Sequence, residues 1–187
     1  MMIVVLGESV IAAMTRADDL QLDVLFLSLL SAMTLKVMYF ELQGEQCQHA
    51  LRVGYIRALL WLYVHAPLYT GTIGIGAVLA QVSEGICWTY LQQQLYCILW
   101  SSVLHFMCVL QLSHKGAGKG VRVLDERVRL GFRFVVAVVR AAMAFILPES
   151  TDDKHVILIC WALAAVATVF EFIGEKPRAD SEDAETR

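Results

Sequence analysis

The stretch that decides the fold runs from Ala58 to Val82 and reads ALLWLYVHAPLYTGTIGIGAVLAQV. It contains no aspartate, glutamate, lysine or arginine. A helix needs about 20 predominantly apolar residues to cross the hydrocarbon core of a bilayer. The stretch exceeds that minimum, so it predicts a transmembrane helix.

The whole chain has the composition of a membrane protein. Of its 187 residues, 58% are hydrophobic and 18% are charged, and the mean hydropathy is +0.60. Soluble domains carry about 25% charged residues and about 45–50% apolar residues. We therefore predict an all-α fold, a polytopic transmembrane helix bundle, with the lipid bilayer as its surroundings. The net charge of −3 and the lack of a basic patch interleaved with aromatic residues predict no nucleic-acid partner.

Other apolar runs lie on both sides of this stretch. Together they predict about six spans: Met1–Thr15, Leu20–Leu42, Tyr55–Val82, Trp88–Leu112, Val128–Leu147 and His155–Ile173. The first run is short and looks like the second part of a helix whose beginning is missing. We expect a transmembrane domain over residues 1–174 and a disordered acidic tail over residues 175–187, because the tail has almost no apolar side chains to pack.

Lysine and arginine residues predict the orientation, since they concentrate in cytoplasmic loops. If the spans alternate in direction, one membrane face receives only Arg16 and Lys154. The opposite face receives nine basic residues: Arg52, Arg57, Lys115, Lys119, Arg122, Arg127, Arg129, Lys176 and Arg178. The basic loops and the C-terminal tail are therefore expected in the cytoplasm.

The sequence contains no motif for catalysis, for a metal or for a cofactor. Its five cysteines show no Cys-x-x-Cys spacing and no accompanying paired histidines, so neither a zinc site nor a redox motif is indicated. The glycine-rich loop at residues 116–120 lacks both the earlier glycine and the serine or threonine of a phosphate-binding loop. We expect a protein that is not an enzyme and that needs no cofactor.

Three segments together resemble one known family: Val5–Ala12 with Gly7 in a Leu-Gly-Glu-Ser motif, Met38–Glu41 with Tyr39, Phe40 and Glu41, and His65–Leu68 in a His-x-Pro-Leu motif followed by Gly71. In these motifs and their order, the chain is similar to the C-terminal portion of the bacterial low temperature requirement A (LtrA) family and its fungal relatives. The resemblance implies a multi-spanning membrane protein, and it supplies no reaction or substrate.

Three ionisable residues fall deep inside predicted spans, where such residues are costly and are candidates for a functional site. At about 1.5 Å of rise per residue, Glu8 and Arg140 lie roughly 10 Å below the outer face and His65 lies roughly 15 Å from the inner face. We predict that the three share a central layer, in which Glu8 pairs with Arg140 or His65. The layer is either a structural ion pair, a working proton or ion site, or an accidental arrangement.

Five other ionisable residues are expected near a membrane boundary, and two helix-breaking residues have two interpretations. The ionisable residues expected nearer the cytoplasmic boundary are Lys36, Glu41, His105, Arg133 and Glu171. The long side chain of Lys36 is expected to reach the interface. Pro67 and Gly71 form a candidate helix break that would line a substrate path. Alternatively, the glycines after Pro67 serve close helix packing.

Two classes of function are compatible with these features. The first is a transporter-like LtrA protein that moves a proton, an ion or a small polar solute through the central Glu8, His65 and Arg140 layer. The second is a membrane assembly or scaffold protein without transport, or a truncated paralogue without function. Access of water to Glu8 and His65 would distinguish the two classes.

Overall fold

The computed structural model describes residues 22–41, 54–83, 86–113 and 126–173. These residues contain no strand and form five helices: α2 (Leu22–Glu41), α4 (Tyr55–Ser83), α5 (Tyr90–Ser113), α6 (Glu126–Ile146) and α7 (Asp153–Phe172). The all-α fold class is confirmed, and each helix begins and ends within two residues of its predicted span. The predicted first span and the acidic tail lie outside the described residues.

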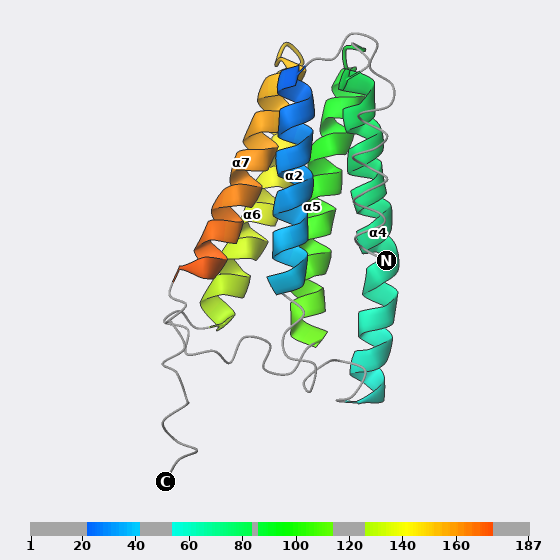
Figure 1. The fold of residues 1–187 in the computed structure, drawn as a ribbon, viewed down its shortest axis with the longest axis vertical. Helices are drawn as coiled ribbons and strands as arrows, with labels where there is room; N and C mark the ends of the chain where they lie inside the picture. The colour runs from blue at the N-terminus through cyan, green and yellow to red at the C-terminus, as the bar shows by residue number, and fades with distance from the viewer. Residues whose placement is uncertain (1–21, 42–53, 84–85, 114–125, 174–187) are drawn as a thin grey trace.

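The helices form an elongated bundle in which α5 lies between α4 and α6 (Figure 1). Helix α7 packs against α6 and α2, and α2 also contacts α4. The connections from α4 to α5 and from α6 to α7 lie at one end, called here the Trp88 end. The opposite end, where α5 finishes and α6 begins, is called the Ser113 end. Helix α4 is the longest, with 29 residues, and it extends past the other helices at the Ser113 end (Figure 1).

Side chains fix the starts of two helices at the Trp88 end. The Thr89 backbone N–H donates to Gln92 Oε1 at 2.7 Å, and the Gln92 backbone N–H donates to Thr89 Oγ1 at 3.4 Å. This reciprocal capping box satisfies two donors that a helix start leaves without partners. Asp153, in the first turn of α7, accepts from the Trp88 backbone N–H at 2.8 Å. The starts of α5 and α7 are therefore held side by side.

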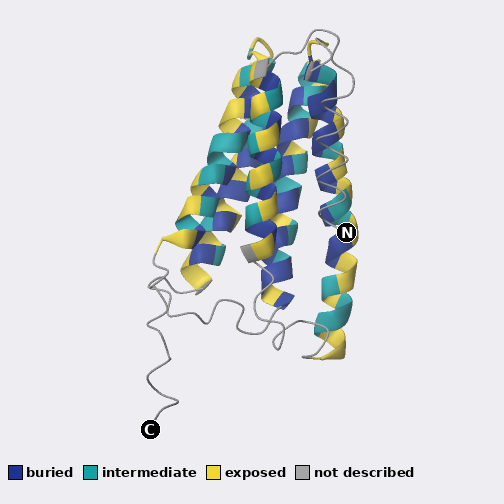
Figure 2. Ribbon diagram, viewed as in Figure 1, coloured by how far each residue is buried: buried dark blue, intermediate teal, exposed yellow. Residues whose placement is uncertain are grey.

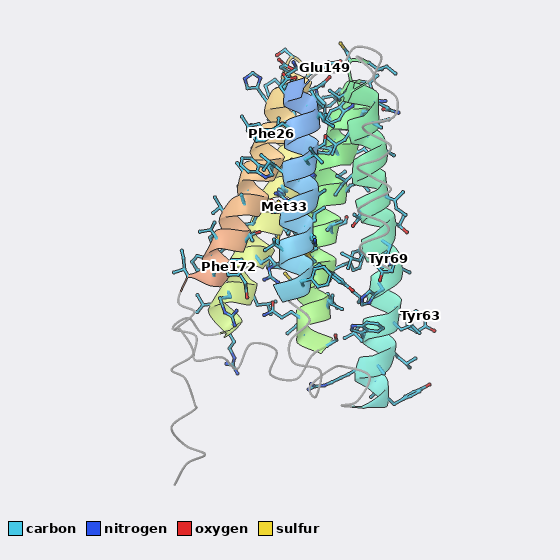
Figure 3. All side chains as sticks on the ribbon, viewed as in Figure 1. Phe26, Met33, Tyr63, Tyr69, Glu149 and Phe172 are labelled. Atoms are coloured by element: carbon cyan, nitrogen blue, oxygen red, sulfur yellow. The ribbon has the colours of Figure 1, made fainter. Side chains whose placement is uncertain are left out.

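Exposed residues lie along the outside of the helices (Figure 2), and many of them are large and hydrophobic. Phe26 and Met33 on α2 are 61% and 65% exposed, and Tyr63 projects away from α4 (Figure 3). Soluble monomers rarely expose contiguous apolar patches larger than a few hundred Å². In addition, α2, α4, α5 and α7 are each long and apolar enough to cross a membrane. The chain is therefore an integral membrane protein.

The charged and apolar faces of α6 are reversed relative to those of an amphipathic helix in a soluble protein. Its arginines at positions 129, 133 and 140 are all buried inside the bundle, whereas apolar side chains such as Val135, Val138 and Phe145 are exposed. In water a surface helix turns its charged face outward and its apolar face inward. The pattern on α6 is therefore inverted relative to that of a soluble surface helix. Its arginines explain why α6 is absent from the four helices that qualify by apolar composition.

Helix α4 runs without interruption through Pro67 and Gly71. The candidate helix break is therefore not what the structure shows, and the alternative of close packing fits instead. A Cβ atom on Gly71 would lie 2.8 Å from Val103 Cγ2 on α5, and one on Gly74 would lie 3.0 Å from Leu99 Cδ1. The first distance is shorter than real Cβ contacts, and the second is tighter than most of them. The absence of side chains at these two positions lets α4 and α5 approach each other closely.

Candidate functional site

The polar interior of the bundle is built mainly by one face of α6. Positions 129, 133 and 140 are separated by four and seven residues, which brings them to the same side of a helix with 3.6 residues per turn. Arg129, Arg133 and Arg140 are each no more than 2% exposed. The side chains that meet them come from α5 and α7, because these two helices pack against α6.

Near the Ser113 end, two of these arginines share one carboxylate. Glu171 on α7 forms ion pairs with Arg129 and, at 2.6 Å, with Nη2 of Arg133. Nη1 of Arg133 also donates to Gln111 Oε1 on α5 at 2.8 Å. This group of four residues, called here the Glu171 network, connects three helices through buried charge-assisted hydrogen bonds, which are among the stronger polar contacts in proteins.

Arg140 occupies a different environment, closer to the Trp88 end. Its Nη2 donates to the backbone carbonyl of Cys160 on α7, and its guanidinium carbon lies 4.6 Å from the centre of the Trp100 ring on α5. Such a cation–π contact offsets part of the cost of a buried charge. Within the described residues, Nε and Nη1 of Arg140 have no hydrogen-bond partner and no carboxylate forms an ion pair with it.

His65 on α4 is held between backbone and side-chain partners. Its Nδ1 lies 2.6 Å from the Trp61 carbonyl oxygen, and its Nε2 lies 3.0 Å from the Tyr39 hydroxyl on α2. A carbonyl oxygen can only accept, so Nδ1 carries the proton in this geometry and the neutral ring accepts from Tyr39 at Nε2. Rings of Trp61 and Tyr69 lie against the imidazole, with centroids 4.1 and 5.4 Å away. In the neutral ring this arrangement fixes one tautomer, with the proton on Nδ1.

The structure does not bring His65 and Arg140 together. Trp161 Nε1 donates to Thr34 Oγ1 at 3.3 Å, which sets the relative heights of α7 and α2. Arg140 contacts the residue just before Trp161, whereas His65 contacts Tyr39, five residues beyond Thr34. At about 1.5 Å per residue, His65 lies roughly 8 Å nearer the Ser113 end than Arg140 does.

The difference from the predicted common layer has a simple cause. Counting from the helix start at Tyr55 assumed that all spans begin at one level, but α4 extends past its neighbours at the Ser113 end. His65 therefore sits lower in the bundle than its position in the sequence suggests. Glu8, the third member of the predicted layer, and Gly7 lie outside the described residues.

Two of the sequence motifs meet in space. Tyr39 and Phe40 near the end of α2 belong to one motif and His65 to another, and the Tyr39–His65 hydrogen bond joins them. Phe40 is exposed, with its ring 5.6 Å from that of Tyr39. Glu41 ends α2, and its side chain is not among those described.

Sequence reasoning missed the partners of the arginines. It placed Arg133 and Glu171 near the same boundary without pairing them, and it did not identify Gln111, Trp100 or Cys160 as neighbours of an arginine. The common helical face of the three arginines was a signal available in the sequence. Which residues of α5 and α7 oppose that face depends on the packing of three helices. No group of three or more metal-ligating side chains occurs in the described part of the chain.

Comparison with known proteins supplies the family. The model of the bacterial low temperature requirement A protein (LtrA) matches residues 1–170. This chain belongs to the LtrA family. The match continues through α5, α6 and most of α7, so the LtrA region includes the buried arginines as well as the three short motifs. No curated protein and no solved structure matches the chain.

Proposed function

We propose that this LtrA-family protein is not an enzyme and that it moves a proton, an ion or a small polar solute through the polar interior of its bundle. One observation carries the proposal: Arg140 is fully buried, and no carboxylate pairs with it in the described part of the chain. An arginine near the centre of a membrane helix costs about 2.5–3.5 kcal/mol on insertion scales. Charged residues at such positions commonly mark ion or substrate pathways.

His65 supports the same proposal from the other side of the bundle. Its ring accepts a hydrogen bond from Tyr39 when neutral and can take a proton at Nε2, where the Tyr39 oxygen can then accept. Histidine commonly serves as a proton shuttle in proteins. A proton can therefore be taken up at His65 without loss of its contact to the Trp61 carbonyl.

The proposed architecture has about six spans, with α6 as a fifth span beside the four apolar helices and residues 1–15 as a sixth. The inward arginines and exposed apolar side chains of α6 support its place in the bilayer. We further propose that the basic loops and the C-terminal tail are cytoplasmic. A cysteine introduced at Gly118 should then not react with an impermeant external thiol reagent in intact cells. Labelling at this position would show that the orientation is the opposite one.

The transport proposal is tested with the purified full chain in proteoliposomes. Proton entry is followed with an internal pH dye, and chloride entry with an internal halide-sensitive dye. We expect flux of at least one ion in the wild type, and a loss of roughly tenfold or more in His65→Ala for protons or in Arg140→Gln for chloride. His105→Ala is the matched histidine control, because His105 is exposed on α5. If liposomes with the wild-type protein take up both ions no faster than protein-free liposomes do, transport of either ion is contradicted.

A second candidate function is a membrane assembly or scaffold protein. The Glu171 network favours it, because there two buried arginines are paired and serve to join three helices. Water access separates the candidates. A cysteine at position 65 that reacts with a small water-soluble thiol reagent in the intact bundle supports a transport path. A cysteine there that stays unreactive, while the native Cys87, which is exposed between α4 and α5, reacts, supports the scaffold.

A further inference from the structure

We infer that Arg140 is the centre of a binding site for a small inorganic anion of the chloride type. The guanidinium has five N–H donors, and Nη2 donates to the Cys160 carbonyl. Nε and Nη1 have no hydrogen-bond partner in the described part of the bundle. A buried unsatisfied polar group in a native protein calls for an explanation, and an ion is one of the few available.

The neighbours of Arg140 are also donors. Trp100, whose ring lies under the guanidinium, has its indole N–H buried, and no described residue accepts from it. Tyr96 lies one turn earlier on α5, and its ring centroid is 6.4 Å from that of Trp100. Its hydroxyl is also buried and has no hydrogen-bond partner among the described residues. An indole N–H can only donate, and a tyrosine hydroxyl can donate. A ligand for the two free N–H groups of the guanidinium carries negative charge and accepts hydrogen bonds.

The packing sets the size of that ligand. Tyr96, Cys97, Trp100 and Cys160 are each fully buried around Arg140. The thiols of Cys97 and Cys160 lie 3.9 Å apart, so α5 and α7 pack closely in this part of the bundle. A compact anion fits such surroundings better than a bulky carboxylate or phosphate ester. Chloride has a single atom and makes no demand on the direction of its donors.

The nearest acidic residue along α7 is already engaged elsewhere. Asp153 lies seven residues before Cys160, which corresponds to roughly 10 Å along the helix. Its Oδ1 accepts from Gln93 Nε2 at 2.9 Å and its Oδ2 accepts from the Trp88 backbone N–H at 2.8 Å. Asp153 therefore holds the Trp88 end of the bundle together and does not neutralise Arg140.

The inference deepens the proposed function, because it names the class of ion. Its claim that the anion moves across the membrane rests on that function, whereas its claim that the anion binds does not. Flux of chloride is measured in proteoliposomes, and binding is measured on the same protein in detergent. Saturable binding without flux would overturn anion transport and leave the site standing, so the two failures are distinguishable.

The binding test follows thermal unfolding of the full chain in detergent while chloride replaces gluconate at constant ionic strength. Above half-saturation, the wild-type Tm should rise by about 3–6 °C for each tenfold increase in chloride. Arg140→Gln should abolish this dependence. Arg133→Gln is the matched control, because Arg133 is buried on the same face of α6 but is paired with Glu171, and it should keep the chloride slope despite a lower starting Tm.

A second measurement needs no variant that removes the charge. Bromide should quench tryptophan fluorescence with a saturable component that chloride reverses and that Trp100→Phe removes. A wild-type protein that shows neither a chloride-dependent Tm nor saturable bromide quenching overturns the inference. An Arg140→Gln protein that responds to chloride as the wild type does also overturns it. A chloride response that appears only in Glu8→Gln would do the same, because the carboxylate of Glu8 would then be the natural partner of Arg140.

Discussion

Tyr39 and His65 join α2 to α4 through a buried hydrogen bond of 3.0 Å between the tyrosine hydroxyl and Nε2 of the imidazole. The two residues belong to motifs that are 26 positions apart in the chain. Helices α2 and α4 share a limited contact, and the larger contacts of α4 are with α5. The hydrogen bond therefore gives α2 and α4 a specific contact where their apolar packing is limited.

Removing the Tyr39 hydroxyl tests the contribution of this hydrogen bond to stability. Tyr39→Phe should lower the free energy of unfolding by about 1 kcal/mol, because Nε2 of His65 loses its hydrogen-bond donor. Thermal unfolding in detergent is measured for Tyr39→Phe, His65→Ala and the double variant. The double variant should be milder than the sum of the single losses. Tyr63→Phe, which alters an exposed ring on the same helix as His65, is the control and should leave stability unchanged; additive losses in the first series would show that the two side chains do not interact.

A methyl group at Gly71 should disturb the α4–α5 contact. Gly71→Ala places its Cβ 2.8 Å from Val103 Cγ2, and Val103 is fully buried and has little room to move. Overpacking of this kind costs about 1–3 kcal/mol. Gly131→Ala on α6 meets nothing within 4 Å, and it should be neutral or stabilising because alanine favours a helix over glycine by about 1 kcal/mol. Val103→Ala should rescue Gly71→Ala; if both glycine variants behave alike, the close approach of the helices is not supported.

Neutralising Glu171 should be far more damaging than neutralising an exposed acid. Glu171→Gln leaves Arg129 and Arg133 buried without their carboxylate, and breaking a buried ion pair costs about 3–5 kcal/mol. Asp23→Asn is the matched control, since Asp23 pairs with Lys154 at 2.5 Å on the surface of the bundle, where ion pairs contribute little. The yield of folded protein and its Tm in detergent are the measurements. Equal, small effects of the two variants would place Glu171 outside the core.

The two buried thiols of α5 and α7 should form a disulfide when an oxidant reaches them. Cys97 Sγ and Cys160 Sγ lie 3.9 Å apart and are both free, so they need to approach by roughly 2 Å to reach the bond length of about 2.05 Å. Iodine, which partitions into membranes, should remove both thiols together, as counted by mass spectrometry after unfolding and alkylation. Cys108 should stay alkylatable, and Cys97→Ser should leave Cys160 alkylatable as well. Independent oxidation of the three cysteines would contradict the packing of α5 against α7.

The sequence predicted the helices well because one physical quantity determines them. Runs such as Tyr55–Val82 are apolar over the thickness of a bilayer, and the described helix Tyr55–Ser83 has almost the same bounds. The depth of His65 was harder to predict, because the overhang of α4 depends on its neighbours. The surroundings of Arg140 could not be predicted from the sequence. Trp100 and Cys160 lie in apolar runs, and only the packing of three helices brings them to Arg140.

The inward arginines of α6 have a consequence for biogenesis. Helix α6 contains four arginines, and it is a poor substrate for insertion by itself, since an arginine near the centre of a helix costs about 2.5–3.5 kcal/mol. The acidic partner of Arg133 comes 38 residues later, in α7. When α6 leaves the ribosome, its counter-charge has not yet been made. We therefore expect α6 to wait at the insertion machinery until α7 emerges, so that the two helices enter the bilayer as one hairpin.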